Sequence, residues 1–100
     1  MARAEREPVS VAESVDRWRR QLGLAAPSTM GSISAVWSEV LGSLAAEVEP
    51  RALVDGTLRV AVGDPAVAEA VRWRASAIVA DLNGRLGDAL VQRVDVRVQR

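Results

Sequence analysis

The sequence predicts a single α+β domain, and three patterns carry this prediction. The first stretch, from Ile33 to Val48, repeats apolar residues at the three- and four-residue spacing of a helix. A second stretch alternates apolar and other residues on either side of Asp55-Gly56, as a β-hairpin does. A third passes from helical spacing after Pro65 to strand alternation before Val98. At 100 residues the chain is long enough for one hydrophobic core of this kind.

The N-terminal part of the chain is expected to form an arm and a helix. Residues 1–9 are charged and polar and end near a proline, which is typical of a disordered arm. Ser10 and the glutamate three residues later have the spacing of a capping box, so a helix should begin at Ser10. Gly23 can end it in the left-handed conformation, and Pro, Ser and Gly in the segment 25–31 indicate a connector. We therefore assign residues 10–30 to an N-terminal helix and connector. The apolar face of this helix carries Trp18, which we expect to pack against the core or another domain.

The stretch from Ile33 to Val48 predicts the main helix, which Pro50 should end because proline cannot donate to the preceding turn. Gly42 lies inside this pattern at a cost of about 1 kcal/mol relative to alanine, so we expect it to allow close contact with a neighbouring strand. The apolar face of the helix should enter the core through Trp37, Leu41, Gly42 and Leu44.

After Pro50 the chain should form a hairpin, a helical stretch and a last strand. Asp55 and Gly56 tolerate the positive φ angles of a type I′ turn, and Asp64-Pro65 is a helix start with an N-cap. Gly87 should end the helical stretch, and alternation over 90–98 predicts the last strand. The predicted core residues of this part are Leu58, Val60, Val62, Ile78 and Leu82.

Trp73 does not fit an unbroken helix from Pro65 to Leu86, because its side chain would point nearly opposite to the apolar face. Either the helix breaks near Trp73 or the indole is exposed. With a break, the element order is α-β-β-α-α-β, that of a type II KH domain, in which helices cover one three-stranded sheet. The sequence thus favours a KH-like fold with an extra N-terminal helix.

Composition limits the chemistry of this chain. It has no histidine, cysteine or tyrosine, which removes imidazole bases, thiol nucleophiles, disulfides and the usual soft metal ligands. It also lacks a GxGxxG or GxxxxGK[ST] motif for nucleotide phosphates. We therefore expect no catalytic residues, no metal and no cofactor. Thirteen arginines balance thirteen acids, so any nucleic-acid binding must use a local patch. With no apolar stretch of membrane-spanning length, we expect a cytoplasmic protein.

The part of the chain from Val15 to Val98 resembles the DciA family. The resemblance rests on an ordered series of residues, namely Trp37, Gly42, Pro50, Asp55-Gly56-Thr57-Leu58-Arg59-Val60, Asp64-Pro65-Ala66, Leu82-Asn83 and Gly87. It implies that residues 31–100 form a KH-like DciA-type domain. It also implies a non-enzymatic accessory protein of DNA replication that contacts the DnaB-type replicative helicase and DNA, and helps to load or activate the helicase.

Trp73 is the best candidate for contact with nucleic acid or a partner, because an indole between Arg72 and Arg74 can stack a base while guanidinium groups meet phosphates. Arg17 and Arg20 could add to a weak, salt-sensitive single-stranded DNA site. Two alternatives stay open: a protein-interaction or oligomerisation module without nucleic acid, and a KH-like RNA-binding domain. The second is disfavoured because the GxxG of residues 84–87 falls at a helix end, whereas KH domains carry theirs between paired helices.

Overall fold

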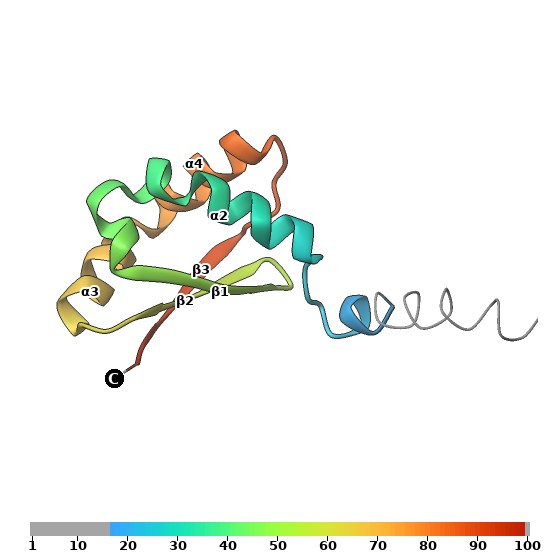
Figure 1. The fold of residues 1–100 in the computed structure, drawn as a ribbon, viewed down its shortest axis with the longest axis horizontal. Helices are drawn as coiled ribbons and strands as arrows, with labels where there is room; N and C mark the ends of the chain where they lie inside the picture. The colour runs from blue at the N-terminus through green and yellow to red at the C-terminus, as the bar shows by residue number, and fades with distance from the viewer. Residues whose placement is uncertain (1–16, 100) are drawn as a thin grey trace, which may run out of the picture.

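The computed structural model describes residues 17–99, so the predicted arm at 1–9 and the capping box at Ser10 lie outside the described residues. Residues 17–21 are helical and are followed by a turn. The rest of the described chain forms, in order, α2 (Pro27–Leu41), the 3₁₀ helix η1 (Gly42–Ala46), β1 (Val48–Val54), β2 (Thr57–Val62), α3 (Pro65–Trp73), α4 (Ala75–Leu86) and β3 (Arg93–Val98). The predicted α+β class is confirmed (Figure 1).

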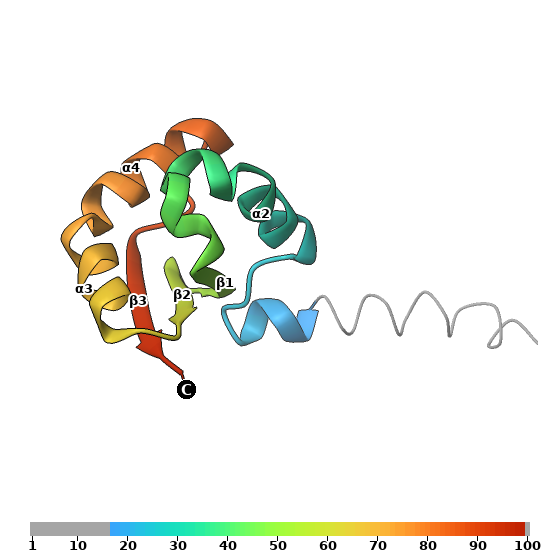
Figure 2. The same cartoon turned by 60° about the vertical axis from the view of Figure 1, so that its left-hand side comes forward.

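The three strands form one mixed sheet in the order β1-β2-β3. β1 and β2 are antiparallel, with Leu53 opposite Leu58, whereas β2 and β3 are parallel, with Val60 opposite Val96. A parallel pair needs a crossover connection, and α3 and α4 together provide it. α2 and α4 lie side by side over one face of the sheet, and α3 packs beside β3 (Figures 1 and 2). The other face of the sheet is left without a covering helix among the described elements (Figure 2).

The core lies between this sheet and α2 and α4. The central strand β2 contributes Leu58, Val60 and Val62, each no more than 2% exposed. The helices contribute Ile33, Trp37, Val40 and Leu41 from α2, and Ile78 and Leu82 from α4. Burying one such aliphatic side chain stabilises the fold by roughly 1.5–3 kcal/mol, so these contacts hold the helical layer on the sheet.

The main helix ends earlier than the sequence predicts. α2 stops at Leu41, and the expectation that it continues to Val48 is wrong. Gly42 adopts φ 62° and ψ −128°, a conformation outside the helical region that favours glycine. A Cβ added at Gly42 would meet nothing within 4 Å, so the expected close contact with a strand is also wrong. Gly42 is exposed and acts by turning the chain, not by packing in the core.

Apolar spacing continues past Leu41 because η1 and β1 face the same core as α2. Leu44 of η1 is half-buried against the core, and Val48 of β1 is 2% exposed. The Trp37 indole N–H donates to the carbonyl of Val48 at 2.8 Å, which joins α2 to β1 directly. Pro50 does not end the helix but lies within β1. β1 is an edge strand, where a residue without an N–H is tolerated.

The turn and cap predictions are confirmed. Asp55 and Gly56 have φ angles of 48° and 81°, as a type I′ turn requires. The Asp64 carboxylate accepts from the N–H of Ala66 at 2.8 Å and so caps α3. Gly87 ends α4 in the left-handed conformation, with φ 75°. These features depend on neighbouring residues alone, which is why the sequence predicts them well.

The helical stretch after Pro65 is broken, as the position of Trp73 predicts. α3 ends at Trp73, α4 begins at Ala75, and Arg74 between them has φ −100° and ψ 6°. The last strand differs from the prediction, because β3 begins at Arg93 and not at position 90. Val91 is buried, but its backbone groups bond the side chain of Asn83 instead of a strand.

The helical residues 17–21 attach to the tip of the hairpin. Gly23 takes the predicted left-handed conformation, with φ 76°. Its carbonyl accepts from the Asp55 N–H at 2.9 Å, and the Ala25 N–H donates to Leu53 at 3.0 Å. Trp18 is 63% exposed, so the expectation that it packs against the core is wrong, while packing against another domain stays a prediction. These bonds hold the segment at the hairpin tip, away from the core.

The connector is shorter than expected, since α2 begins at Pro27 and position 30 lies inside it. Proline is favoured at the first turn of a helix because its missing N–H has no partner there in any case. Among residues 17–99, no helix is both long enough and apolar enough to cross a membrane.

Candidate nucleic-acid and partner interface

The corner where α3 meets α4 presents a tryptophan between two arginines. α3 buries Ala68 and Val71 against the sheet, and Trp73 follows two residues later, which turns it by about 200° around the helix. Its side chain is 87% exposed. An indole with so large an exposed fraction is uncommon on a protein surface, and it is suited to stacking on a flat ligand group or docking on a partner.

Arg72 holds the corner against the sheet. Its guanidinium pairs with Glu69 at 2.8 Å, one turn earlier in α3. A second nitrogen approaches the carbonyl of Val96 in β3 at 3.4 Å, while the side chain stays half exposed. Exposed ion pairs contribute little net free energy, about 0–1 kcal/mol. The Glu69 carboxylate therefore competes only weakly with a phosphate for the Arg72 guanidinium. Arg72 therefore lies both at the corner and at the edge of β3.

Arg74 lies at the corner on the side of α2. One guanidinium nitrogen is 3.5 Å from the carbonyl of Val40, in the last turn of α2. The carbonyl end of a helix attracts a positive charge, which favours this position. Arg74 forms no ion pair with any residue from 17 to 99 and is exposed. Its charge is therefore available to an anionic ligand.

Arg17 and Arg20 are not brought to this corner. They belong to the helical residues 17–21, which attach at the hairpin tip through Gly23 and Asp55. The α3–α4 corner follows from the opposite end of β2, so the two groups lie at opposite ends of the sheet (Figure 1). The structure thus assembles Arg72, Trp73 and Arg74 and leaves Arg17 and Arg20 apart from them.

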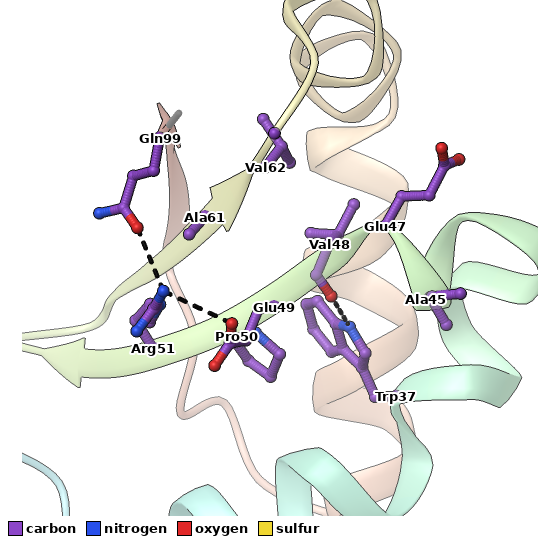
Figure 3. A pocket seen from close by; sticks show the side chains of 12 residues that line it. Trp37, Ala45, Glu47, Val48, Glu49, Pro50, Arg51, Ala61, Val62 and Gln99 are labelled. Carbon is purple, nitrogen blue, oxygen red and sulfur yellow. Dashed lines mark hydrogen bonds and ion pairs between the residues drawn. The ribbon is translucent and has the colours of Figure 1, made fainter.

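A hollow of ≈ 510 Å³ lies at the start of β1, away from the hairpin tip, between η1 and the end of β3. Trp37 lines it, with its N–H already bonded to Val48, and Glu47 and Glu49 line its rim (Figure 3). Arg51 crosses the hollow, 3.5 Å from the Glu49 carboxylate and 3.1 Å from the side-chain oxygen of Gln99. Arg51 thus joins β1 to the residue that follows β3, which makes the hollow a structural joint between the two sheet edges.

Sequence reasoning missed a second group of arginines, on the uncovered face of the sheet. Arg51, Arg59 and Arg97 come from three different strands and line one shallow hollow. Alternation with buried residues such as Leu58 and Val96 indicates the face on which each arginine lies. Their convergence depends on the strand order and on the irregular register between Pro50 and Ala52, which alternation alone does not predict.

The protein is thus a small α+β domain, in which exposed arginines and a tryptophan form the candidate contact surface. The model of the family described as "Dna[CI] antecedent, DciA" matches residues 10–96. The chain therefore belongs to the DciA family, and the resemblance noted in the sequence is confirmed. These are bacterial accessory proteins of DNA replication, of the helicase-loader type, and not an enzyme family. No curated protein matches the chain.

Proposed function

We propose that this protein binds a DnaB-type replicative helicase and, weakly, single-stranded DNA, and so aids loading or activation of the helicase in the cytoplasm. Trp73 carries the proposal: it is 87% exposed between two arginines, in a chain of the helicase-loader family. The protein itself hydrolyses no nucleotide in this proposal, and the energy for loading comes from its partner.

We also assign the domain to the KH-like folds of type II. In support, the element order is α-β-β-α-α-β once η1 is counted with α2, and two of the three strands are parallel. KH domains clamp a nucleic-acid backbone with a GxxG loop between their paired helices. This chain has Arg72-Trp73-Arg74-Ala75 at that corner, without glycine. We infer that base stacking on the indole replaces the close approach of a glycine-rich backbone.

The same corner explains why DNA binding should be weak. Stacking of one base on an aromatic side chain contributes roughly 1–3 kcal/mol. Two arginines at the corner neutralise few phosphates, and each contact with a single strand contributes about 0.7 to the slope of log K against log salt. The balanced charge of the whole chain adds no long-range attraction to DNA. Such a site suits a factor that must release the strand to the helicase.

The proposal is tested by size-exclusion chromatography with light scattering, on the protein mixed with the replicative helicase of its organism, with and without single-stranded DNA. We expect a stoichiometric complex that Trp73→Ala weakens. Trp18→Ala is the matched control, because Trp18 is 63% exposed at the opposite end of the sheet. Absence of a complex under all conditions, with the protein shown to be folded, would refute the helicase assignment.

A second candidate function is a protein-interaction module that does not touch nucleic acid. The observation in its favour is the exposure of large apolar side chains at both ends, with Leu22 49% exposed beside Trp18. Such side chains commonly mark protein interfaces. A DNA titration without any salt-dependent signal, together with an intact helicase complex, would favour this candidate.

A further inference from the structure

The uncovered face of the sheet is shaped by the central strand. Residues of β2 alternate, so that Leu58 and Val60 enter the core while Arg59 and Ala61 face away from the helices. Ala61 lies opposite Arg97 of β3 in the parallel register. Although it is on the uncovered face, Ala61 is only 7% exposed. Longer side chains from the neighbouring strands therefore surround this small residue, and it forms the floor of a depression.

This depression is a hollow of ≈ 250 Å³, and its rim is basic. Arg51, Arg59 and Arg97 line it together with Gln99, and no carboxylate is among the described residues that line it. A water molecule in the liquid takes about 30 Å³, so the hollow has room for a phosphate group and several waters. Three guanidinium groups around a small floor residue form a site whose charge and size suit one phosphate.

The guanidinium groups are held in place but remain available. Arg51 pairs with Glu49 at 3.5 Å and also reaches across β2 to Gln99 at 3.1 Å, a bond that Figure 3 shows beside Ala61. Arg97 pairs with Asp95 at 3.1 Å, with 70% of its side chain exposed. Arg59 forms no ion pair with any residue from 17 to 99. Exposed pairs are weak, so a phosphate, which arginine binds through two parallel hydrogen bonds, can compete with these carboxylates.

The basic hollow is connected to the α3–α4 corner through β3. Arg72 approaches the carbonyl of Val96, and Val96 is the residue directly before Arg97. An arginine of the corner and an arginine of the hollow thus lie against the same short piece of strand. A nucleic-acid strand that stacks a base on Trp73 can therefore continue over β3 onto the open face.

We infer that the hollow of Arg51, Arg59 and Arg97 binds a backbone phosphate of single-stranded DNA. The inference rests on the proposed function and extends it, because it adds a second contact to the strand held at Trp73. No aromatic side chain is among the described residues lining the hollow. The hollow therefore holds the backbone without reading bases, and its contribution is independent of sequence.

The test is fluorescence anisotropy of a labelled oligothymidylate titrated with the protein at several NaCl concentrations. We expect Arg59→Gln and Arg97→Gln each to lower the slope of log K against log salt by about 0.7, and the double variant to lower it by about 1.4. Arg19→Gln, which removes one charge from the helical residues 17–21, is the control and should leave the slope unchanged. Circular dichroism shows that each variant is folded.

A second pair of variants probes the floor of the hollow without removing any arginine. Ala61→Glu places a carboxylate among the guanidinium groups, and like charges then face the phosphate, so we expect affinity to fall roughly tenfold. Ala61→Gln has nearly the same size but no charge, and should bind more tightly than Ala61→Glu. Equal affinity of these two variants would mean that the hollow does not hold an anion.

The outcomes separate this inference from the proposed function. If the wild-type protein binds DNA and the Arg59 and Arg97 variants keep its affinity and slope, the inference is overturned and the proposed function stands. If the wild-type protein binds no DNA in any salt, the inference and the DNA part of the proposed function both fail, while the helicase complex is tested separately. If the variants lose only the helicase complex, the hollow is a protein contact and the inference is overturned.

Discussion

The side chain of Asn83 bonds both backbone groups of Val91, across the turn that joins α4 to β3. Its amide nitrogen donates to the Val91 carbonyl at 2.8 Å, and its oxygen accepts from the Val91 N–H at 2.9 Å. The backbone carbonyl of Asn83 also accepts from Gly87, which ends the helix. One residue therefore closes α4 and fixes the chain that leads into β3. The end of α4 therefore depends on Asn83 and Gly87 together.

Asn83→Ala should destabilise the domain. It removes two hydrogen bonds and leaves the N–H and carbonyl of buried Val91 without these partners. At roughly 1 kcal/mol for each bond, we expect the free energy of unfolding to fall by about 2 kcal/mol. In a domain of this size, that corresponds to a decrease of roughly 10 °C in Tm. Thermal unfolding followed by circular dichroism measures it. Ser76→Ala, at an exposed position of α4, is the control, and a similar Tm for both variants would contradict this role of Asn83.

Trp37→Phe should destabilise the joint between α2 and β1. Trp37 is 6% exposed and donates to the Val48 carbonyl at 2.8 Å. Phenylalanine keeps part of the packing but loses this donor and some buried volume, for an expected cost of about 2 kcal/mol. Urea unfolding followed by circular dichroism is the measurement, since tryptophan fluorescence itself changes. Trp18→Phe, at an exposed site, should change stability by less than about 0.5 kcal/mol. Equal effects of the two substitutions would show that the indole N–H bond contributes nothing.

The boundaries of α2 show which parts of the fold the sequence predicts. The Asp55-Gly56 turn and the Asp64 cap depend on adjacent residues and are predicted correctly. The end of α2 is not, because the apolar spacing continues through η1 into β1, and all three elements face one core. Spacing reports which residues are buried, and it cannot show that the backbone changes conformation at Gly42.

The candidate site residues likewise include a group that the sequence predicts and a group that it does not. Arg72, Trp73 and Arg74 are consecutive, so their proximity follows from the chain itself, and a helical wheel predicts the orientation of Trp73. Arg51, Arg59 and Arg97 meet because of strand order, parallel pairing and a bulge. These are long-range features that a single sequence does not reveal.

Gly31, within α2, and Gly42, directly after its last residue, should respond to alanine in opposite directions. A Cβ at Gly31 or at Gly42 would meet no atom within 4 Å, so steric contact does not distinguish them. Gly31 lies within the helix, where alanine is better by roughly 1 kcal/mol, and Gly31→Ala should stabilise by that amount. Gly42 has φ 62° and ψ −128°, and Gly42→Ala should destabilise by about 1–3 kcal/mol. Urea midpoints that shift in the same direction for both variants would contradict this account of the helix end.

Trp73→Phe should remove most of the fluorescence change that single-stranded DNA causes. Trp37 is buried and Trp18 lies at the other end of the sheet, so among the three tryptophans Trp73 is the one placed to stack on a base. Stacking on the indole quenches its emission, and phenylalanine retains an aromatic face while giving no signal in the tryptophan range. The measurement is a titration of emission with oligothymidylate, with Trp18→Phe as the matched control that should keep the quenching. Quenching that persists in Trp73→Phe and disappears in Trp18→Phe would move the stacking site to the hairpin end, where Arg17 and Arg20 lie.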